Sequence, residues 1–562
     1  MAVDYSISWR EPNDHLFDIA ITFTTPVDSP RLLLPAWRPG RYLIQNYAAN
    51  VREWSATAPI RKEEKSTWRV DAKAGQQITV RYRYYAGVLD AGSSFLDEEE
   101  AYFNGTNLFM MVEPLRDLAA RLSIGAPEDW LVETQLAHVR PNTYEARDYD
   151  HLIDSPTVAA GSMTQHHFDH DDTTVHLVFR GDEGLDTKQY VEPTRAIVRS
   201  QAALFRELPV REYRFLVHVG DIWHGVEHEE SCSIVIKRAD VLDSRSGDLA
   251  WDHVLAIISH EFFHLWNVKR IMPAAFMPYD YSRETPTRLL WAMEGITSYY
   301  GELTLVRAGL WDEERYLKHL KHEIETLENA PGRQHLSLAQ ASFDGWLHDP
   351  AQMHDVSNSW ISFYNKGEVV AALLDLAIRS RSDRSLDDVM RFLWSEYGSR
   401  SRGLEEDAIE KAVAFVSGYD FSDFFRRYVD GVEPLPYQQL LAAAGITFES
   451  TPRQAGFGAR FRTSEGAVVF DSVVQGGGAM AAGILPRDEL IAIDGARIRS
   501  EKDVEKLLRA HQDERPFDVL TARRGLIQRR TVTARLDGSI DVTLKMVEGD
   551  NALRRAWLRR DG

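Results

Sequence analysis

The sequence has one cysteine, Cys232, in 562 residues. A single thiol cannot form an internal disulfide, so the fold has to rest on buried apolar cores, and this composition fits a reducing compartment. No window of about 18 apolar residues exists, so we predict no membrane span. The N-terminus has neither a basic start nor an apolar run. We therefore see no signal peptide and expect a cytoplasmic protein.

Basic residues are fewer than acidic ones. The chain has 65 Lys and Arg and 85 Asp and Glu, which gives a formal charge of −20. An acidic balance argues against a nucleic-acid partner and mildly attracts cationic ligands such as a free amino terminus. The hydrophobic content of 44% is typical of a globular protein with sizeable cores. The length is enough for about three or four domains.

The pattern along the chain predicts an α+β multidomain protein. Residues 1–170 alternate apolar and polar side chains and predict an antiparallel β domain. Residues 171–445 read as strands up to about 240 and then as helices, with a helical subdomain from about residue 310. Residues 450–545 return to short strands and glycine and predict a separate small domain. Residues 546–562 are a basic tail, which forms either a short amphipathic helix or a frayed end, and we expect the frayed end.

The chain is organised around an H-E-x-x-H motif that begins at His260 and ends at His264. Two histidines four residues apart lie on the same side of a helix, which we predict over residues 249–268. They can share one zinc ion, and Glu261 between them can take a proton from the water that the metal activates.

A zinc peptidase needs a third protein ligand. The metzincin continuation fails, because the chain has Asn267 and Arg270 where glycine and histidine would be required. The next helix, predicted to begin at Thr285 and Pro286, offers three carboxylates: Glu284, Glu294 and Glu302. Glu294 lies in an apolar stretch, where a carboxylate is costly unless something compensates it. A metal would do so, and a salt bridge to an arginine such as Arg270 is the alternative.

Residues 260–271 and 291–300 resemble the extended H-E-x-x-H signature and the third-ligand helix of the M61 metallopeptidases, the glycyl aminopeptidase family. The resemblance implies a thermolysin-like catalytic domain with a helical C-terminal part. It also implies one Zn²⁺ per chain, with His260, His264 and Glu294 as its ligands.

Two further segments resemble motifs of the same clan. Residues 363–368 resemble its Y-x-K-G segment, which implies that Tyr364 stabilises the oxyanion. Residues 225–228 resemble its exopeptidase motif, which implies that Gly225 and Glu227 bind the substrate and that Glu227 holds the free α-amino group. The segments 37–42 and 104–107 are either loops that face a site or ordinary hairpin loops.

The C-terminal block resembles a PDZ domain, with Gly456, Phe457 and Gly458 in its carboxylate-binding loop. Such a loop captures peptide C-termini through backbone N–H groups. Whether this domain binds peptide or only packs against the enzyme stays open.

These features predict a zinc aminopeptidase acting on peptides with a free amino terminus. A preference for small first residues such as Gly or Ala comes from the resemblance alone. The alternatives are a zinc endopeptidase whose PDZ domain captures substrates and an inactive PDZ scaffold.

Overall fold

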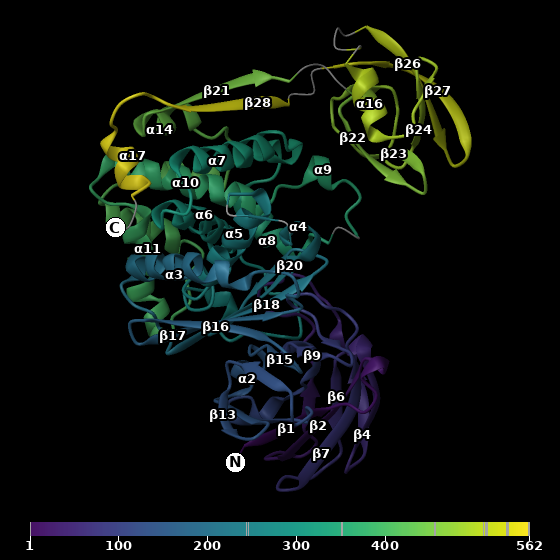
Figure 1. Cartoon of the computed structure of the whole chain (residues 1–562), viewed down its shortest axis with the longest axis vertical. Helices are drawn as coiled ribbons and strands as arrows, with labels where there is room; N and C mark the ends of the chain where they lie inside the picture. Colours follow the sequence, from purple (N-terminus) through teal and green to yellow (C-terminus); the bar gives the residue numbers. More distant parts are fainter. Residues whose placement is uncertain are drawn as a thin grey trace.

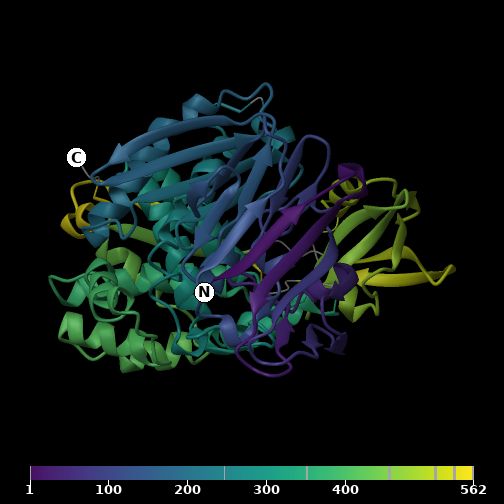
Figure 2. The same ribbon diagram turned by 90° about the horizontal axis from the view of Figure 1, so that it is seen from below.

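The computed structural model describes residues 2–242, 244–245, 247–349, 352–453, 457–509, 511, 515–535 and 539–559. Figure 1 shows an N-terminal β domain at one end, a central sheet covered by helices, and a small C-terminal domain set to one side. The view from below separates the C-terminal end of the chain from that small domain (Figure 2). The predicted α+β class with an N-terminal β domain is confirmed.

Three sheets build the N-terminal β domain. Their strand orders are β13-β14-β11-β1-β2-β7-β4, β10-β3-β6-β5 and β12-β15-β9-β8, and every pair is antiparallel except β1 with β11. The alternating side chains of β2 and β7 bury one face in a common apolar core. The elements are β1 (Val3–Ser8), β2 (Leu16–Thr24), β3 (Arg31–Leu33), β4 (Val51–Ala56), β5 (Ile60–Glu64), β6 (Thr67–Val70), β7 (Gln77–Tyr85), β8 (Phe95–Leu96), β9 (Glu100–Phe103), α1 (Gly105–Leu108), β10 (Met111–Val112), β11 (Ala120–Ile124), β12 (Leu131–Thr134), β13 (Ala137–Arg140), β14 (Thr143–Ala146), α2 (Tyr149–Ile153) and β15 (Thr157–Ala160).

The central sheet has the order β16-β17-β18-β20-β19, in which β17, β18 and β20 are parallel. Parallel neighbours need a crossover, and α3 supplies it between β17 and β18. The prediction of strands throughout residues 171–240 is wrong at this helix, which buries one apolar face under the sheet. The elements are β16 (Thr164–His170), β17 (Thr173–Arg180), α3 (Val191–Phe205), β18 (Glu212–Gly220), β19 (His224–Glu227), β20 (Ser231–Lys237), α4 (Arg238–Val241) and α5 (Leu249–Phe263).

A helical layer follows α5 and packs into the same core. The helix predicted to begin at Thr285 starts later, with the π-helical turn η6 and then α6. The Glu406 carboxylate explains the delay, because it accepts hydrogen bonds from Thr287 Oγ1 and Arg288 N and holds that segment out of the helix. The elements are η6 (Trp291–Gly295), α6 (Ile296–Arg307), α7 (Glu313–Glu328), α8 (Leu338–Phe343), α9 (Val356–Ser359), α10 (Phe363–Arg381), α11 (Leu386–Glu396), α12 (Ala408–Ser417), α13 (Ser422–Phe424), η10 (Phe425–Val429) and α14 (Tyr437–Ala443).

The C-terminal domain is a sheet of order β22-β23-β24-β26-β27 with its own apolar core. The predicted range 450–545 is too wide for it, because β21 and β28 pair with each other and lie on the helical layer (Figure 1). Asn329 bonds the backbone of Ile540 twice there. The elements are β21 (Ile446–Pro452), β22 (Ala459–Ser464), β23 (Ala467–Val473), α15 (Gly478–Ala481), β24 (Glu489–Ile493), β25 (Ala496–Arg497), α16 (Glu501–Leu508), β26 (Pro516–Arg523), β27 (Leu526–Thr533) and β28 (Ile540–Met546).

The described part of the basic tail, residues 546–559, contains a docked helix, so the prediction of a frayed end is wrong there. It forms α17 (Ala552–Trp557), and the Trp557 ring is fully buried in the core of the helical layer. Trp557 Nε1 donates to the Tyr299 hydroxyl at 2.8 Å, and Arg307 Nη2 donates to Trp557 O at 3.1 Å. The buried aromatic ring and these two hydrogen bonds dock the short helix on the helical layer.

None of the helices that the structure describes combines the length and the apolar composition that crossing a bilayer requires. The cytoplasmic location stays a prediction.

Candidate active site

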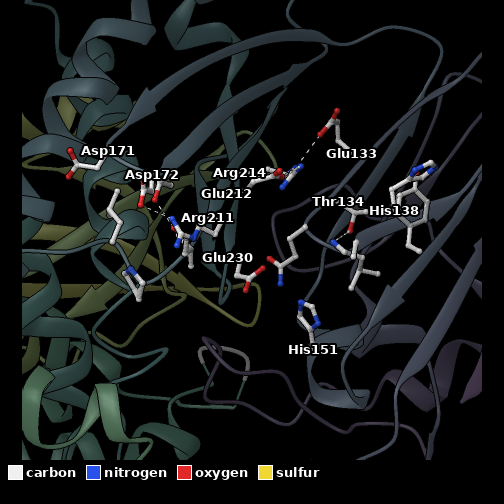
Figure 3. A pocket seen from close by; sticks show the side chains of 18 of the residues that line it. Glu133, Thr134, His138, His151, Asp171, Asp172, Arg211, Glu212, Arg214 and Glu230 are labelled. Carbon is white, nitrogen blue, oxygen red and sulfur yellow. Dashed lines mark hydrogen bonds and ion pairs between the residues drawn. The ribbon is translucent and has the colours of Figure 1, made fainter. Parts of the chain in front are cut away.

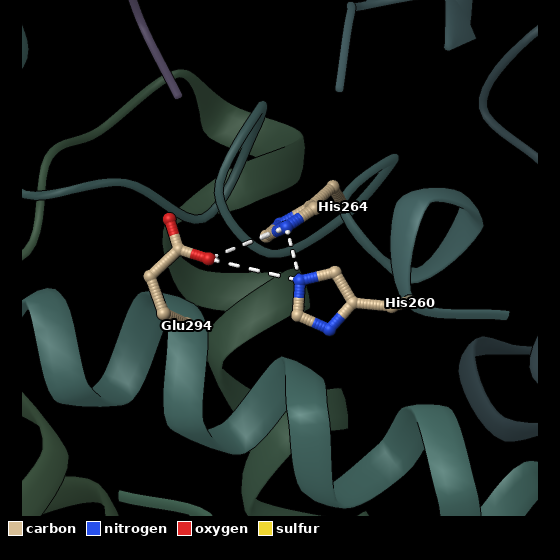
Figure 4. Close-up of side chains that lie close together, drawn as sticks. All are labelled: His260, His264 and Glu294. Atoms are coloured by element: carbon tan, nitrogen blue, oxygen red, sulfur yellow. Dashed lines mark hydrogen bonds and ion pairs between the residues drawn. The ribbon is translucent and has the colours of Figure 1, made fainter. Parts of the chain in front are cut away.

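Helix α5 and the turn η6 bring the three predicted metal ligands together (Figure 4). His264 Nε2 lies 3.1 Å from His260 Nε2 and 3.5 Å from Glu294 Oε2, and His260 Nε2 lies 3.8 Å from the same oxygen. Metal bonds of about 2.0–2.2 Å in a tetrahedral arrangement separate neighbouring donors by roughly 3.3 Å. The donor set and its spacing therefore fit a zinc ion.

Asn267 fixes this arrangement through hydrogen bonds to His264 and to η6. Its carbonyl accepts a hydrogen bond from His264 Nδ1 at 2.7 Å, which leaves the Nε2 lone pair of His264 free for a metal. Its side-chain amide donates to the carbonyls of Ala292 and Met293 and to Thr297. The residue that excluded the metzincin pattern thus joins the end of α5 to η6.

Glu294 is 2% exposed and makes no salt bridge with Arg270. Arg270 instead bonds the backbone of Glu229 at 3.0 Å, so the alternative partner considered from the sequence is wrong. The second oxygen of Glu294 accepts a hydrogen bond from the Tyr42 hydroxyl at 2.7 Å. Tyr42 is in the N-terminal segment 37–42, which therefore faces the site. From the sequence, this segment was either a loop facing a site or an ordinary hairpin loop, and no role for Tyr42 was predicted.

The π-helical turn η6 lies against the start of α10, where Tyr364 is the second residue. Gly295 and Gly367 meet backbone to backbone at this crossing, since a Cβ on Gly295 would lie 2.5 Å from the Gly367 carbonyl carbon. The pair of glycines lets Tyr364 approach the ligands, and its ring stacks 6.4 Å from the ring of His260. π-Helical turns occur frequently at functional sites.

Glu261 is buried beside the ligands, and its Oε2 has no hydrogen-bond partner among the described residues. Burial, together with the nearby carboxylates of Glu227 and Glu294, raises the pKa of Glu261 to about 8 in the absence of a metal charge, against the opposing effect of His260. Gly225 on the edge strand β19 fits against it, because a Cβ there would lie 2.7 Å from the carboxyl carbon of Glu261.

Glu227, also on β19, is 4% exposed. One of its carboxylate oxygens lies within 4.8 Å of donor atoms of Glu261 and His264, and its Oε1 has no hydrogen-bond partner among the described residues. Its neighbour His228 is held by Asp154, which Lys269 also bonds at 2.9 Å. The structure thus places a carboxylate with one unpartnered oxygen beside Glu261, at the residue to which the resemblance gives amine binding.

The predicted PDZ loop lies in the C-terminal domain, away from these residues. Gly456 falls outside the described residues. The Phe457 ring packs into the core of the domain, and Gly458 has a positive φ of 64°. Both carbonyls of this pair accept backbone hydrogen bonds, from Ala479 N and Val474 N. A carboxylate-binding role for the loop stays a prediction.

A hollow of about 1200 Å³ lies between the N-terminal β domain and the central sheet (Figure 3). None of the predicted site residues within the described part of the chain lines it. Its charges include the pairs Arg214 with Glu133 at 3.4 Å and Arg211 with Asp172 at 2.9 Å. The hollow is therefore separate from the candidate active site.

Comparisons with known proteins agree with this arrangement. Residues 4–161 match the Peptidase M61 N-terminal domain, residues 253–370 match M61 glycyl aminopeptidase, and residues 469–517 match a PDZ domain. No curated protein matches the chain in sequence.

Two solved structures show how far the likeness extends. An aminopeptidase N family protein from Idiomarina loihiensis is 29% identical, with a TM-score of 0.93 over 99% of this chain and 100% of that chain. An M1 zinc metallopeptidase from Deinococcus radiodurans is 13% identical, with a TM-score of 0.48 over 78% of this chain and 95% of that chain. The first likeness covers every part of the fold described above.

Proposed function

We infer the reaction from the premise that the chain belongs to the M61 family of metallopeptidases and carries a C-terminal PDZ domain. We propose that it is a zinc aminopeptidase with one ion per chain, which removes the first residue of peptides that have a free amino terminus. We further propose that it prefers small first residues such as Gly or Ala. This preference rests on the match to M61 glycyl aminopeptidase.

His260, His264 and Glu294 would hold the zinc, and this donor set leaves a fourth position open for water or substrate. A zinc ion bound there supplies Lewis-acid chemistry, because it polarises the scissile carbonyl and lowers the pKa of a water molecule. The Tyr42 hydroxyl keeps the carboxylate of Glu294 in place through its 2.7 Å hydrogen bond. A metal charge also compensates the burial of Glu294.

Glu261 acts as the general base. It takes the proton of the attacking water and gives it to the leaving amine. Its carboxylate lies against Gly225, where a side chain would fill the space beside the base. The Tyr364 hydroxyl donates a hydrogen bond to the oxyanion of the tetrahedral intermediate. Because the ring stacks near His260, this donor lies on the same side of the site as the ligands.

The assignment to an aminopeptidase depends on Glu227. Its buried, unsatisfied carboxylate beside Glu261 suits a cationic α-amino group, since an ammonium donates charge-assisted hydrogen bonds to it. An amine held there places the first peptide bond, and no later one, beside the base. This observation favours an exopeptidase over an endopeptidase.

The PDZ domain supplies a second contact for peptides in this proposal. Strand β22 is at the edge of its sheet, with α16 beside it, so a peptide C-terminus can add as a further strand.

The test compares glycyl-arylamide with its N-acetylated form on the zinc-loaded enzyme. We expect turnover of the free amide only. Equal cleavage of both would support an endopeptidase, and cleavage of neither, even by chelator-free enzyme with stoichiometric zinc, would support an inactive scaffold. Glu227→Gln should lower kcat/KM for the free amide about 10- to 100-fold. Glu230→Gln, in the connection that follows β19, is the matched control and should leave it unchanged.

A further inference from the structure

The N-terminal segment 37–42 brings three residues to the active site from another domain. Tyr42 bonds Glu294, as described above. Gly40 lies against Glu227, because a Cβ on Gly40 would be 2.7 Å from Glu227 Oε1. The third residue is Arg38, whose side chain the reaction as proposed does not use. The segment therefore contacts both the metal-ligand side and the amine side of the site.

Arg38 is a buried cation that lacks a counter-charge. It is 3% exposed, and no carboxylate of the described residues lies within ion-pair distance of it. Its Nε is buried with no hydrogen-bond partner there, and its Nη1 donates to the backbone carbonyl of Pro39 at 3.2 Å. Leaving a buried charge unpaired is strongly unfavourable, so an arginine in this state is unusual in a folded protein.

The other buried arginines of the described chain are paired. Arg180 donates to Glu100 at 2.7 Å, and Arg307 donates to Asp387 at 3.0 Å. Both are 8% exposed, so their burial is comparable with that of Arg38. The missing partner of Arg38 is therefore a property of its position and is not a general feature of this fold.

The surroundings of Arg38 belong to the amine side of the site. Its guanidinium lies directly over Gly92, where any side chain would overlap it, so the surrounding loop leaves it room. Ala91, next to Gly92, packs against Val226, the neighbour of Glu227 on β19. Arg38 thus approaches the site from the side on which Glu227 would hold the amine.

We propose that Arg38 is a subsite for a carboxylate of the bound peptide, so that the site recognises an amine at Glu227 and a carboxylate at Arg38. The guanidinium fork matches a carboxylate and can bind it through two hydrogen bonds. The carboxylate is either the C-terminus of a dipeptide or an acidic side chain of a longer peptide. This inference rests on the proposed aminopeptidase function and names its substrate class more closely.

Two pairs of peptides separate the two sources of carboxylate. Gly-Ala against Gly-Ala-amide reports a C-terminal carboxylate, and Asp-Ala-amide against Asn-Ala-amide reports a side-chain carboxylate. For each pair the measured quantity is the ratio of the two kcat/KM values. In Arg38→Gln we expect one of the ratios to fall about 10- to 100-fold, which is typical for the loss of a charge-assisted bond. The ratio that falls identifies the source.

Arg41→Gln is the matched control, because Arg41 is exposed and lies in the same segment. Both ratios should keep their wild-type values in this variant. Arg38→Lys keeps the charge without the fork and should retain an intermediate ratio, and thermal unfolding checks that each variant is folded. The proposal is wrong if neither ratio changes in Arg38→Gln, or if Arg41→Gln changes the same ratio equally.

Binding to the zinc-loaded Glu261→Gln enzyme separates this inference from the aminopeptidase proposal. Calorimetry compares Gly-Ala with Gly-Ala-amide, and Asp-Ala-amide with Asn-Ala-amide, with and without Arg38→Gln. A carboxylate preference that disappears with Arg38→Gln supports the subsite even if no free-amine substrate is turned over. Equal binding within both pairs overturns the subsite even if glycyl-arylamide is cleaved.

Discussion

The close contact between Gly295 and Gly367 predicts that an alanine at either position destabilises the protein, and by different amounts. Alanine at 295 would place its Cβ 2.5 Å from the Gly367 carbonyl carbon, whereas alanine at 367 would place its Cβ 2.9 Å from Gly295 Cα. Both neighbours are backbone atoms, so relief requires η6 and α10 to separate as rigid units. Gly301 lies in α6, which continues from η6. A Cβ on Gly301 would lie 3.5 Å from His260 Cα, which is an ordinary contact.

The expected free-energy changes follow from these distances. Overpacking typically destabilises by about 1–3 kcal/mol, while replacing a helical glycine by alanine returns roughly 0.5–1 kcal/mol. We therefore expect Gly295→Ala to lower the free energy of unfolding by about 2 kcal/mol and Gly367→Ala by about 1 kcal/mol. Gly301→Ala should be neutral or slightly stabilising.

Separation of η6 from α10 also displaces Glu294, so zinc affinity should fall in the same order. A ligand moved from its supported position typically loses about 10- to 100-fold in metal affinity. Thermal unfolding of the apo-proteins measures stability, and competition with a chelator measures zinc affinity. The reasoning is refuted if Gly295→Ala matches Gly301→Ala in both measurements, because the glycine contact would then not position the ligand.

Three further changes test separate parts of the site. Glu261→Gln should reduce kcat by about 10²- to 10⁴-fold while zinc stays bound in metal analysis, and an active variant would remove Glu261 from the mechanism. Tyr42→Phe should weaken zinc about 10- to 100-fold by freeing Glu294, and unchanged chelator competition would contradict this. Burial alone would lower the pKa of His319, but Glu368, 2.6 Å away, helps raise it to about 10. The charged imidazole therefore stabilises the fold fully below pH about 6.5, and this contribution is lost as the pH rises towards 10. His319→Gln should thus lower the Tm more at pH 6 than at pH 10, and an equal loss at both would refute the assignment.

The meeting of His260, His264 and Glu294 could be predicted because the information is local. The four-residue spacing from His260 to His264 sets one helical face, and the apolar residues around Glu294 made a solvated carboxylate implausible. The helix start at Thr285 was predicted wrongly for the opposite reason. Glu406, more than a hundred residues later, bonds that segment and delays the helix. Local capping rules cannot take account of such a distant partner.

The C-terminal end shows the same contrast between local sequence information and tertiary contacts. The basic composition of residues 546–562 favours a frayed tail, yet the buried Trp557 docks it on Tyr299. Only the fold shows that β21 and β28, nearly a hundred residues apart, pair on the helical layer and leave the small domain between them.

The sequence alone was enough to predict a metal-binding set, since residue type and helical period decide which side chains can meet at one ion. Tertiary structure decided what surrounds His260, His264 and Glu294. Tyr42, Arg38 and Gly40 come from the N-terminal β domain, and Gly367 comes from α10. Their roles depend on distances across domains, and no periodicity along the chain encodes such distances. A buried guanidinium that lacks a carboxylate partner among the described residues becomes visible only when every neighbouring carboxylate has been placed.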